Sequence, residues 1–319
     1  MNWSRGGDTL SPLNTPNTPR TPRTLNKFII SMANSFPFYS PSLSKLRKSD
    51  IRFPSLLALD VDGTLARPDG TISDYTIEVV RELQRRGMRL CIASGRPPLG
   101  IRPVAKLLGM DEFGGYIIGF NGGCLADYAT GNVLYTASLP DEALPVVVEC
   151  GRRPGHTMLT YINDEICTED ASDHYVQVSH ARNGMPVREV SDFMSLPKPM
   201  PKCIITGCPC NMPALQREVS ARLYGIADAY LSDAFFLEVV RRGTDKADAL
   251  VRLLDLLELT HDNLIAAGDG HNDMGMIRLA SIGIAMGNAH PDVRKVADIV
   301  APDASADGLA QVLERLLEE

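Results

Sequence analysis

The 319-residue sequence contains no apolar stretch close to the roughly 20 residues that a membrane-spanning helix needs. We therefore expect that the protein is not integral to a membrane. Its seven cysteines are odd in number and scattered, which argues against a disulfide framework and fits reduced thiols in a cytoplasmic protein. The Cys208-Pro209-Cys210 pair lacks the paired spacing of zinc sites, and the six histidines show no ligand spacing. The sequence therefore predicts no structural zinc site.

Basic side chains are scarce outside the first 50 residues. The whole chain carries a net charge of −7, yet residues 1–49 hold seven basic side chains and one acidic side chain, so the remainder is strongly acidic. An acidic body repels the phosphates of nucleic acids, and we expect no nucleic-acid partner. A small anionic substrate would have to be held by a metal ion or by a few placed cations. The oligomeric state stays open between monomer and homodimer.

Residues 1–50 are rich in serine, threonine, proline and asparagine and have little to bury, which predicts a disordered tail. Three interpretations compete: a dispensable tail, a start site placed too early with Met32 as the real start, or an organelle transit peptide. Repeated Thr-Pro pairs disfavour the long amphipathic helix that transit peptides need, so the first two interpretations are favoured.

Strand and helix patterns alternate from Ser55 onward. The hydrophobic periodicity predicts strands at residues 55–62, 88–94 and 115–121, and helices at 73–86, where Ser73 is the cap, and 97–108. The alternation resumes after residue 240, with a helix from Thr244, strands at 263–269, 282–286 and 298–300, and helices from 273, at 291–296 and from 307. This succession is typical of a parallel sheet with right-handed crossovers.

The segment between these two parts has a different pattern. Residues 124–138 predict a hairpin that turns at 130–132, and helices at 141–150 and 212–223 are interleaved with strands at 157–163, 202–207 and 235–240. We therefore expect an α/β protein with a doubly wound, Rossmann-like parallel sheet made by residues 51–123 and 241–319. Residues 124–240 would form an inserted α+β domain.

Two carboxylates stand where the first predicted strand ends. Asp60 and Asp62 in Asp-Val-Asp-Gly-Thr lie two residues apart, so they share one face, and Gly63 lets the chain turn away. Ligands bind at this edge of open parallel sheets. Two solvated acids in a turn would give the same pattern, but side by side they are costly unless a cation or a shared proton relieves their repulsion.

A second acidic group follows another predicted strand, in Gly-Asp-Gly-His-Asn-Asp. Asp269, Asn272 and Asp273 could simply form a glycine turn with a cap for the next helix. Their place at a second carboxyl-terminal strand end favours a further function, because acids from two strand ends supply the oxygen ligands that Mg²⁺ prefers. The sequence therefore predicts a magnesium site where these two strand ends meet.

Anion-binding features complete the pattern. Ser94 and Gly95 follow the second strand directly before a helix, where a hydroxyl and free N–H groups can bind an anion or merely cap the helix. Lys246 lies in the first turn of its helix, where a cation is normally disfavoured, so it suggests an anion nearby. A solvated surface lysine is the plain alternative.

Taken in order, these motifs resemble the haloacid dehalogenase-like (HAD) superfamily, specifically the Cof-type phosphatases with a large C2B-type cap. The resemblance covers residues 55–319 and rests on LDVDGT, ASGR, the lysine of GTDKADAL, and GDGHND, with NGG before the insert and AMGNA near the end. It implies that the parallel sheet is a HAD-like core and that residues 124–240 are the cap domain. His271 replaces the glutamate common at its position, and the resemblance suggests little effect.

The resemblance also implies site roles. Asp60 would attack phosphorus, and Asp62 would first protonate the leaving oxygen and then activate water, in a crowded and partly desolvated place where it can hold a proton. Mg²⁺ would be held by Asp60, the backbone carbonyl of Asp62 and Asp269, with Asp273 supporting the metal. The phosphate would be bound by Ser94, Gly95, Lys246 and Asn272.

The expected function is therefore hydrolysis of a small phosphorylated metabolite, a sugar phosphate or phosphorylated cofactor, through an aspartyl-phosphate intermediate with Mg²⁺. The presence of Asp62 argues against ion pumps and true dehalogenases, which lack this second aspartate. A phosphomutase remains possible and would require a bisphosphate activator. A non-catalytic regulator that binds phosphorylated metabolites on the same fold is the alternative from a different class.

Overall fold

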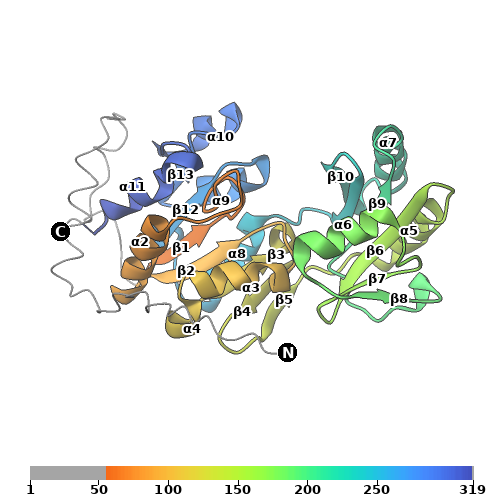
Figure 1. The fold of residues 1–319 in the computed structure, drawn as a ribbon, viewed down its shortest axis with the longest axis horizontal. Coiled ribbons are helices and arrows are strands. Elements are labelled where there is room, and N and C mark those ends of the chain that lie inside the picture. Colours follow the sequence, from red (N-terminus) through yellow and green to blue (C-terminus); the bar gives the residue numbers. More distant parts are fainter. Residues whose placement is uncertain (1–54, 318–319) are drawn as a thin grey trace, which may run out of the picture. The chain divides into compact units, whose positions relative to one another are not determined.

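The computed structural model describes residues 55–317, so the predicted tail at residues 1–50 lies outside the described residues. Within them an eight-stranded sheet has the strand order β14-β13-β12-β1-β2-β3-β4-β5 (Figure 1). The strands that pair in parallel are β1 (Leu56–Leu59), β2 (Arg89–Ala93), β3 (Tyr116–Gly119), β12 (Leu264–Gly268), β13 (Ile282–Ala285) and β14 (Ile299–Val300). The predicted α/β class with a doubly wound parallel sheet is confirmed.

Alternation along the central strand gives this sheet two apolar faces. Leu57 and Leu59 pack into one buried cluster with α2 (Asp74–Arg85), α3 (Pro98–Leu107), α4 (Met110–Phe113), α10 (Pro291–Val296) and α11 (Gly308–Glu314). Leu56 and Ala58 point to the other face and pack with α8 (Lys246–Leu256). Both faces are covered by helices, which is the arrangement that buried parallel strands require.

Helix α2 and helix α11 come from opposite ends of the described chain and lie side by side (Figure 1). The Tyr75 hydroxyl donates to the Glu314 carboxylate at 2.6 Å between them. At the start of α2, the Ser73 hydroxyl accepts from the backbone N–H of Thr76 at 3.1 Å, which confirms the predicted cap. Helix α8 begins at Lys246, two residues later than the predicted start at Thr244, and Asp245 is its cap.

A second sheet of six strands has the order β10-β11-β9-β6-β7-β8. Its strands are β6 (His156–Ile162), β7 (Glu165–Thr168), β8 (Val187–Glu189), β9 (Lys202–Gly207), β10 (Ala227–Asp233) and β11 (Phe236–Arg241). Helices α5 (Leu144–Gly151), α6 (His174–Asn183) and α7 (Met212–Arg222) accompany it, and it has its own buried core. Strands β7, β8 and β10 and helices α4 and α6 were not predicted.

The hairpin of β4 (Cys124–Asp127) and β5 (Val133–Thr136) differs from the expectation. We predicted it as part of the insert, yet β4 pairs antiparallel with β3 and extends the large sheet. The reason is the tight turn through Phe120–Gly122, which returns the chain directly beside β3. The second sheet begins only at β6. The boundaries between core and cap domain, expected at residues 123/124 and 240/241, stay predictions.

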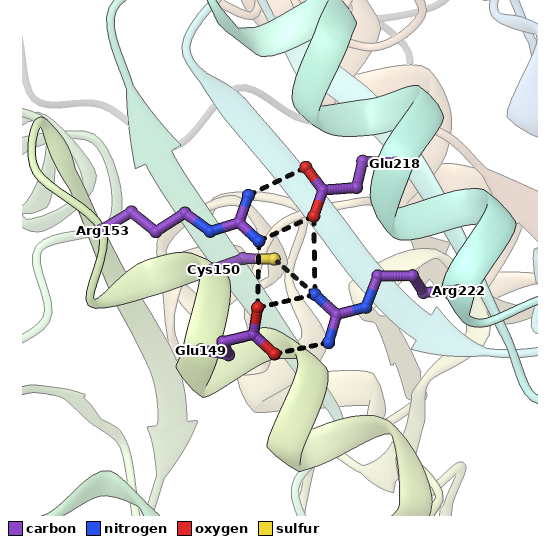
Figure 2. Close-up of polar contacts among 5 residues, drawn as sticks. All are labelled: Glu149, Cys150, Arg153, Glu218 and Arg222. Atoms are coloured by element: carbon purple, nitrogen blue, oxygen red, sulfur yellow. Dashed lines mark hydrogen bonds and ion pairs between the residues drawn. The ribbon is translucent and has the colours of Figure 1, made fainter.

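Helices α5 and α7 are linked by a group of charged side chains (Figure 2). Arg153 donates to both carboxylate oxygens of Glu218 at 2.7 and 2.8 Å, and Arg222 donates to both oxygens of Glu149 at 2.6 and 3.0 Å. Hydrogen bonds from Arg222 and Arg153 lower the pKa of Glu149 to about 2. The four side chains are 33–56% exposed, so solvent screens their ion pairs and the group adds little stability beside the apolar core.

The structure bears on the expectations about membrane-spanning helices and cysteines. In residues 55–317, none of the helices combines the length and the apolar character that crossing a membrane demands. All seven cysteines fall in this part of the chain and are free; five are buried, and Cys208 and Cys210 are exposed. The Sγ atoms of the exposed pair lie 2.7 Å apart at the turn before α7.

Candidate active site

Four neighbouring parallel strands, β12, β1, β2 and β3, bring the sequence motifs to one edge of the large sheet. Asp60 directly follows β1, and its N–H donates to the Ala267 carbonyl of β12 at 3.0 Å. Ser94 follows β2, and its N–H donates to the Ile118 carbonyl of β3 at 2.9 Å. Since parallel strands end on the same side, this edge is where the fold places ligands.

Three carboxylates meet at this edge. Asp60, Asp269 and Asp273 each offer an oxygen atom, and these atoms lie within 4.8 Å of one another. Asp60 and Asp273 are buried and Asp269 is partly buried. The predicted convergence of the residues after β1 and β12 is therefore what the structure shows.

The side chain of Lys246 is fully buried between two of these acids. Its Nζ donates to Asp60 Oδ1 and to Asp273 Oδ1, both at 2.6 Å. Lys246 lies in the first turn of α8, as predicted, and its side chain joins the carboxyl ends of β1 and β12. It is not the solvated surface lysine of the plain alternative.

The crowding changes how these groups titrate. Burial, opposed by Lys246 and reinforced by Asp273 and Asp269, raises the pKa of Asp60 to about 7. Burial and Asp273 raise the pKa of Asp269 to about 6. Burial alone would lower the pKa of Lys246, but Asp60 and Asp273 raise it, so the lysine stays charged. One ammonium group thus faces three carboxylates, and a proton or a second cation must relieve the excess negative charge.

This donor set fits a magnesium ion. Mg²⁺ prefers carboxylate oxygens, water and phosphate oxygens, and a divalent charge balances the two carboxylates that Lys246 leaves uncompensated. Asp273 is already committed to protein groups. Its Oδ1 accepts from Lys246, and its Oδ2 accepts from the N–H groups of Asp269 and Gly270 at 3.0 and 2.9 Å. Asp273 therefore holds the turn that carries Asp269.

Asp62 departs from the expectation. We predicted a crowded, partly desolvated carboxylate, but its side chain is 61% exposed and is paired with Arg96, whose Nε donates at 2.9 Å. The reason is that Asp62 lies in the turn that follows β1, where Val61 is buried and the side chain of Asp62 is left in solvent. Asp62 and Asp60 nevertheless line the same cavity.

The predicted phosphate-binding residues also line this cavity, apart from Lys246, which is fully buried. Ser94 is buried, and Gly95 has the amide of Asn121 so close that an added Cβ would lie 3.1 Å from its nitrogen. Asn272 donates to Asn121 Oδ1 at 2.9 Å. Ser94, Gly95 and Asn272 therefore line the same cavity as Asp60.

The cavity has a volume of about 550 Å³ and is lined from both sheets. Strands β6, β9 and β11 of the second sheet contribute Tyr161, Lys202 and Glu238. Lys202 and Glu238 are 3% and 8% exposed and form an ion pair of 2.9 Å. A carboxylate cluster on one side of the cavity thus faces a buried ion pair that belongs to the other sheet.

A sequence model of the haloacid dehalogenase-like hydrolase family matches residues 57–313, which is most of the chain. The chain belongs to this family. The resemblance inferred from the motifs is confirmed.

Individual relatives agree with the family assignment. The chain is 30% identical over 243 residues to the HMP-PP phosphatase of Yersinia pseudotuberculosis, covering 75% of this chain and 86% of that protein. It is 26% identical over 268 residues to the 5-amino-6-(5-phospho-D-ribitylamino)uracil phosphatase YitU of Bacillus subtilis, covering 82% and 97%. A crystal structure of a haloacid dehalogenase-like hydrolase from Bacteroides thetaiotaomicron is 40% identical, with a TM-score of 0.78, and covers 82% and 99%.

Several residues of this HAD-like site were not predicted. Asn288 donates to the Gly63 carbonyl at 2.8 Å and to Asp269 Oδ2 at 3.3 Å, so it ties the turn after β1 to the turn after β12. Its place in AMGNA was quoted only as part of the resemblance. Arg96 belongs to ASGR in the same way. Lys202 and Glu238 gave no sequence signal, because a lone charge in a strand is usually solvated.

Proposed function

We propose that this chain is a Mg²⁺-dependent phosphatase that hydrolyses a small phosphorylated metabolite through an aspartyl-phosphate formed on Asp60. The observation that carries the proposal is the buried Lys246, which holds Asp60 and Asp273 beside Asp269 at the ligand-binding edge of the sheet. Relatives are named as phosphatases of phosphorylated metabolites, which supports a phosphoric monoester hydrolase.

In the proposed reaction a carboxylate oxygen of Asp60 attacks the phosphorus, and the bond from phosphorus to the leaving oxygen breaks. Asp62 gives its proton to that oxygen, so a neutral alcohol departs. A water molecule then gives a proton back to Asp62 and attacks the phosphorus of the aspartyl-phosphate, which releases phosphate and restores Asp60. The carboxylate nucleophile divides hydrolysis into two easier steps.

The other residues have supporting roles in this proposal. Lys246 orients Asp60 through Oδ1, and with Ser94, Gly95 and Asn272 it would bind the equatorial phosphate oxygens. Asp60, the carbonyl of Asp62 and Asp269 would hold Mg²⁺, which supplies positive charge against the charge on the phosphoryl oxygens. Arg96 must release Asp62 before the carboxyl group can reach the leaving oxygen, and an incoming phosphate group offers Arg96 an alternative partner.

The second sheet would receive the leaving group. Glu238 accepts from Lys202 and, at 3.2 Å, from the Tyr230 hydroxyl, while Lys202 lies 5.4 Å from the centre of the Phe120 ring. A leaving group placed against this pair must itself offer hydrogen bonds, since apolar contact would leave two ions poorly solvated. This favours a polyhydroxylated group, such as a sugar or a ribityl chain, over an apolar one.

Hydrolysis of p-nitrophenyl phosphate tests the proposal. We expect turnover that requires Mg²⁺, stops with chelator and falls about 10⁴-fold or more in Asp60→Asn. Asp127→Asn is a matched control at the end of β4, where it pairs with the first residue of β3 and does not line the cavity, and it should keep full activity. Turnover without added bisphosphate separates a phosphatase from a mutase. Metal-independent turnover, or turnover that survives Asp60→Asn, would defeat the proposed aspartyl-phosphate mechanism. A complete lack of binding and turnover across a panel of phosphorylated metabolites would defeat the proposed phosphatase function.

A further inference from the structure

Two histidines that lie 19 positions apart in the sequence meet outside the carboxylate cluster. The rings of His271 and His290 have their centroids 4.1 Å apart, tilted by 45°. Together with Asp292 they form an exposed group in which one possible ligand atom from each residue lies within 4.8 Å of the others. In the described residues 55–317 this is one of two such groups, and the other is the carboxylate cluster.

The fold explains why these side chains converge. His271 opens the short 3-10 helix η7 (His271–Asp273) after β12, and His290 caps α10 after β13. Since β12 and β13 are parallel neighbours, the segments after them emerge side by side. The His290 N–H also donates to the Asp269 carbonyl at 3.1 Å, which fixes the two turns to each other.

The contacts inside the group point to a cation. His290 Nδ1 lies 3.6 Å from Asp292 Oδ2 and accepts from the Asp292 N–H at 3.3 Å. Asp292 Oδ1 accepts from Lys295 at 2.8 Å, and this lysine is 72% exposed and free to move into solvent. Possible ligand atoms of all three side chains lie within 4.8 Å of one another, so a metal ion bound there would have to replace only the 3.3 Å hydrogen bond to His290 Nδ1 and the exposed ammonium group of Lys295.

The donor chemistry differs from that of the carboxylate cluster. Imidazole nitrogen suits Zn²⁺, Co²⁺ and Ni²⁺, whereas Mg²⁺ prefers an all-oxygen shell. We propose that His271, His290 and Asp292 form a second metal site, selective for such transition metals, at the rim of the HAD-like site. Three protein ligands leave one position for water, as in open zinc sites. The site is independent of whether the carboxylate cluster performs phosphatase chemistry.

Binding of Co²⁺ to the full chain tests this site, because Co²⁺ in a four- or five-coordinate nitrogen and oxygen shell absorbs visible light. The parent for all titrations carries Cys208→Ser and Cys210→Ser, so that the exposed thiols cannot contribute, and Mg²⁺ is kept saturating. We expect one equivalent of Co²⁺ to produce the absorption. His271→Asn and His290→Asn should each weaken binding by at least about tenfold. The surface variant His261→Asn, in the short 3-10 helix η6 (His261–Asn263), should bind as the parent does.

Asp269→Asn separates the two sites. This change removes a carboxylate of the cluster but keeps the backbone carbonyl that contacts His290, so Co²⁺ binding should persist. The proposal is overturned if the parent takes up no Co²⁺, if His271→Asn binds as tightly as the parent, or if Asp269→Asn abolishes binding while the histidine variants retain it. Far-ultraviolet circular dichroism of each variant shows that the fold is kept, as expected for exposed side chains.

Discussion

At the carboxyl ends of β1 and β12, the side chain of Lys246 is the buried cation that permits Asp60 and Asp273 to stand together. Its methylene chain is enclosed and its ammonium group has a carboxylate on two sides. Removing one member of a buried ion pair leaves its partner with a charge that neither water nor protein compensates. Here the partners are Asp60 and Asp273. We therefore expect this position to matter for stability as well as for the proposed phosphate binding.

Replacing Lys246 with methionine tests the stabilising part. In chelator, Lys246→Met should lower the free energy of unfolding by about 3–5 kcal/mol, because Asp60 and Asp273 lose their countercharge. Urea denaturation measures the change, and Lys106→Met is the control because that lysine is 76% exposed. A loss no larger than that of the control would contradict the role assigned to Lys246.

The raised pKa values predict a pH dependence. Folding raises the pKa of Asp60 to about 7 and of Asp269 to about 6 from a usual value of 3.8, so the folded state binds more protons between these limits. The free energy of unfolding in chelator should therefore fall as the pH rises from 5 to about 7. Urea denaturation across this window measures it, and saturating Mg²⁺ should reduce the fall.

The double variant Asp60→Asn/Asp269→Asn is the control for this pH dependence. It lacks both groups whose protons are lost, so its unfolding free energy should change much less between pH 5 and 7. An unchanged slope in the double variant would show that other groups cause the pH dependence.

At the level of single residues, the sequence predicted those members of the site whose charge is unusual for their position in a strand or helix. Asp60, Asp269 and Lys246 carry charge at strand ends or in a first helical turn, and all three converge. The exposure of Asp62 and the pairing with Arg96 were missed, since they depend on the direction in which the turn at Gly63 leaves the sheet. The meeting of His271 and His290 was missed because it depends on β12 and β13 being neighbours.

Among the elements, the turn between β3 and β4 positions the start of α8. Gly122 has φ +101°, and an added Cβ would lie 1.9 Å from the backbone oxygen of Asp245, which caps the helix that begins with Lys246. No side-chain rearrangement can relieve a clash with backbone. The glycine therefore allows the turn after β3 to touch the N-terminus of α8.

Gly122→Ala should cost about 2–5 kcal/mol of unfolding free energy, from the left-handed backbone and from the displaced helix start. The matched control is Gly131→Ala in the β4–β5 turn, with φ +72° and nothing near its Cβ, which should cost about 1–2 kcal/mol. Urea denaturation compares them. Equal losses would show that the contact with Asp245 does not constrain the fold.

The elements of the large sheet could be predicted because each strand is a short apolar run between clear helix signals. The missed elements have weaker patterns for physical reasons. Helix α6 buries few side chains, among them Val176 and Ser179, so it has no apolar stripe. Strand β8 has three residues, and β10 is mostly half-buried, so neither shows clear alternation.

For the whole molecule, the proposed function assigns separate tasks to the two sheets that line the cavity between the carboxylate cluster and the Lys202–Glu238 pair. The large sheet carries the groups proposed for phosphoryl transfer, and the second sheet carries groups that would contact only the leaving group. Sequence patterns predicted both parts but not this pair, because strand registers decide which side chains face the cavity.

Glu238→Gln tests this division of tasks. For the metabolite that a substrate panel identifies, the variant should raise KM about tenfold or more, because a charged hydrogen-bond partner of the leaving group is lost. For p-nitrophenyl phosphate, kcat should stay within about twofold, since the phosphoryl groups are untouched. Glu165→Gln, on an exposed pair with Arg188, is the control. Equal losses on both substrates would contradict the assignment.

Trapping the acyl-phosphate with borohydride tests the mechanism most directly, since reduction converts a phosphorylated aspartate to homoserine, which peptide mass spectrometry locates. With Mg²⁺ and p-nitrophenyl phosphate, homoserine should form at position 60 alone. The yield should increase in Asp62→Asn, because a good leaving group needs no acid while hydrolysis of the intermediate needs the base. Rapid turnover with no homoserine at position 60 in either protein, or with homoserine at another aspartate, would contradict the account.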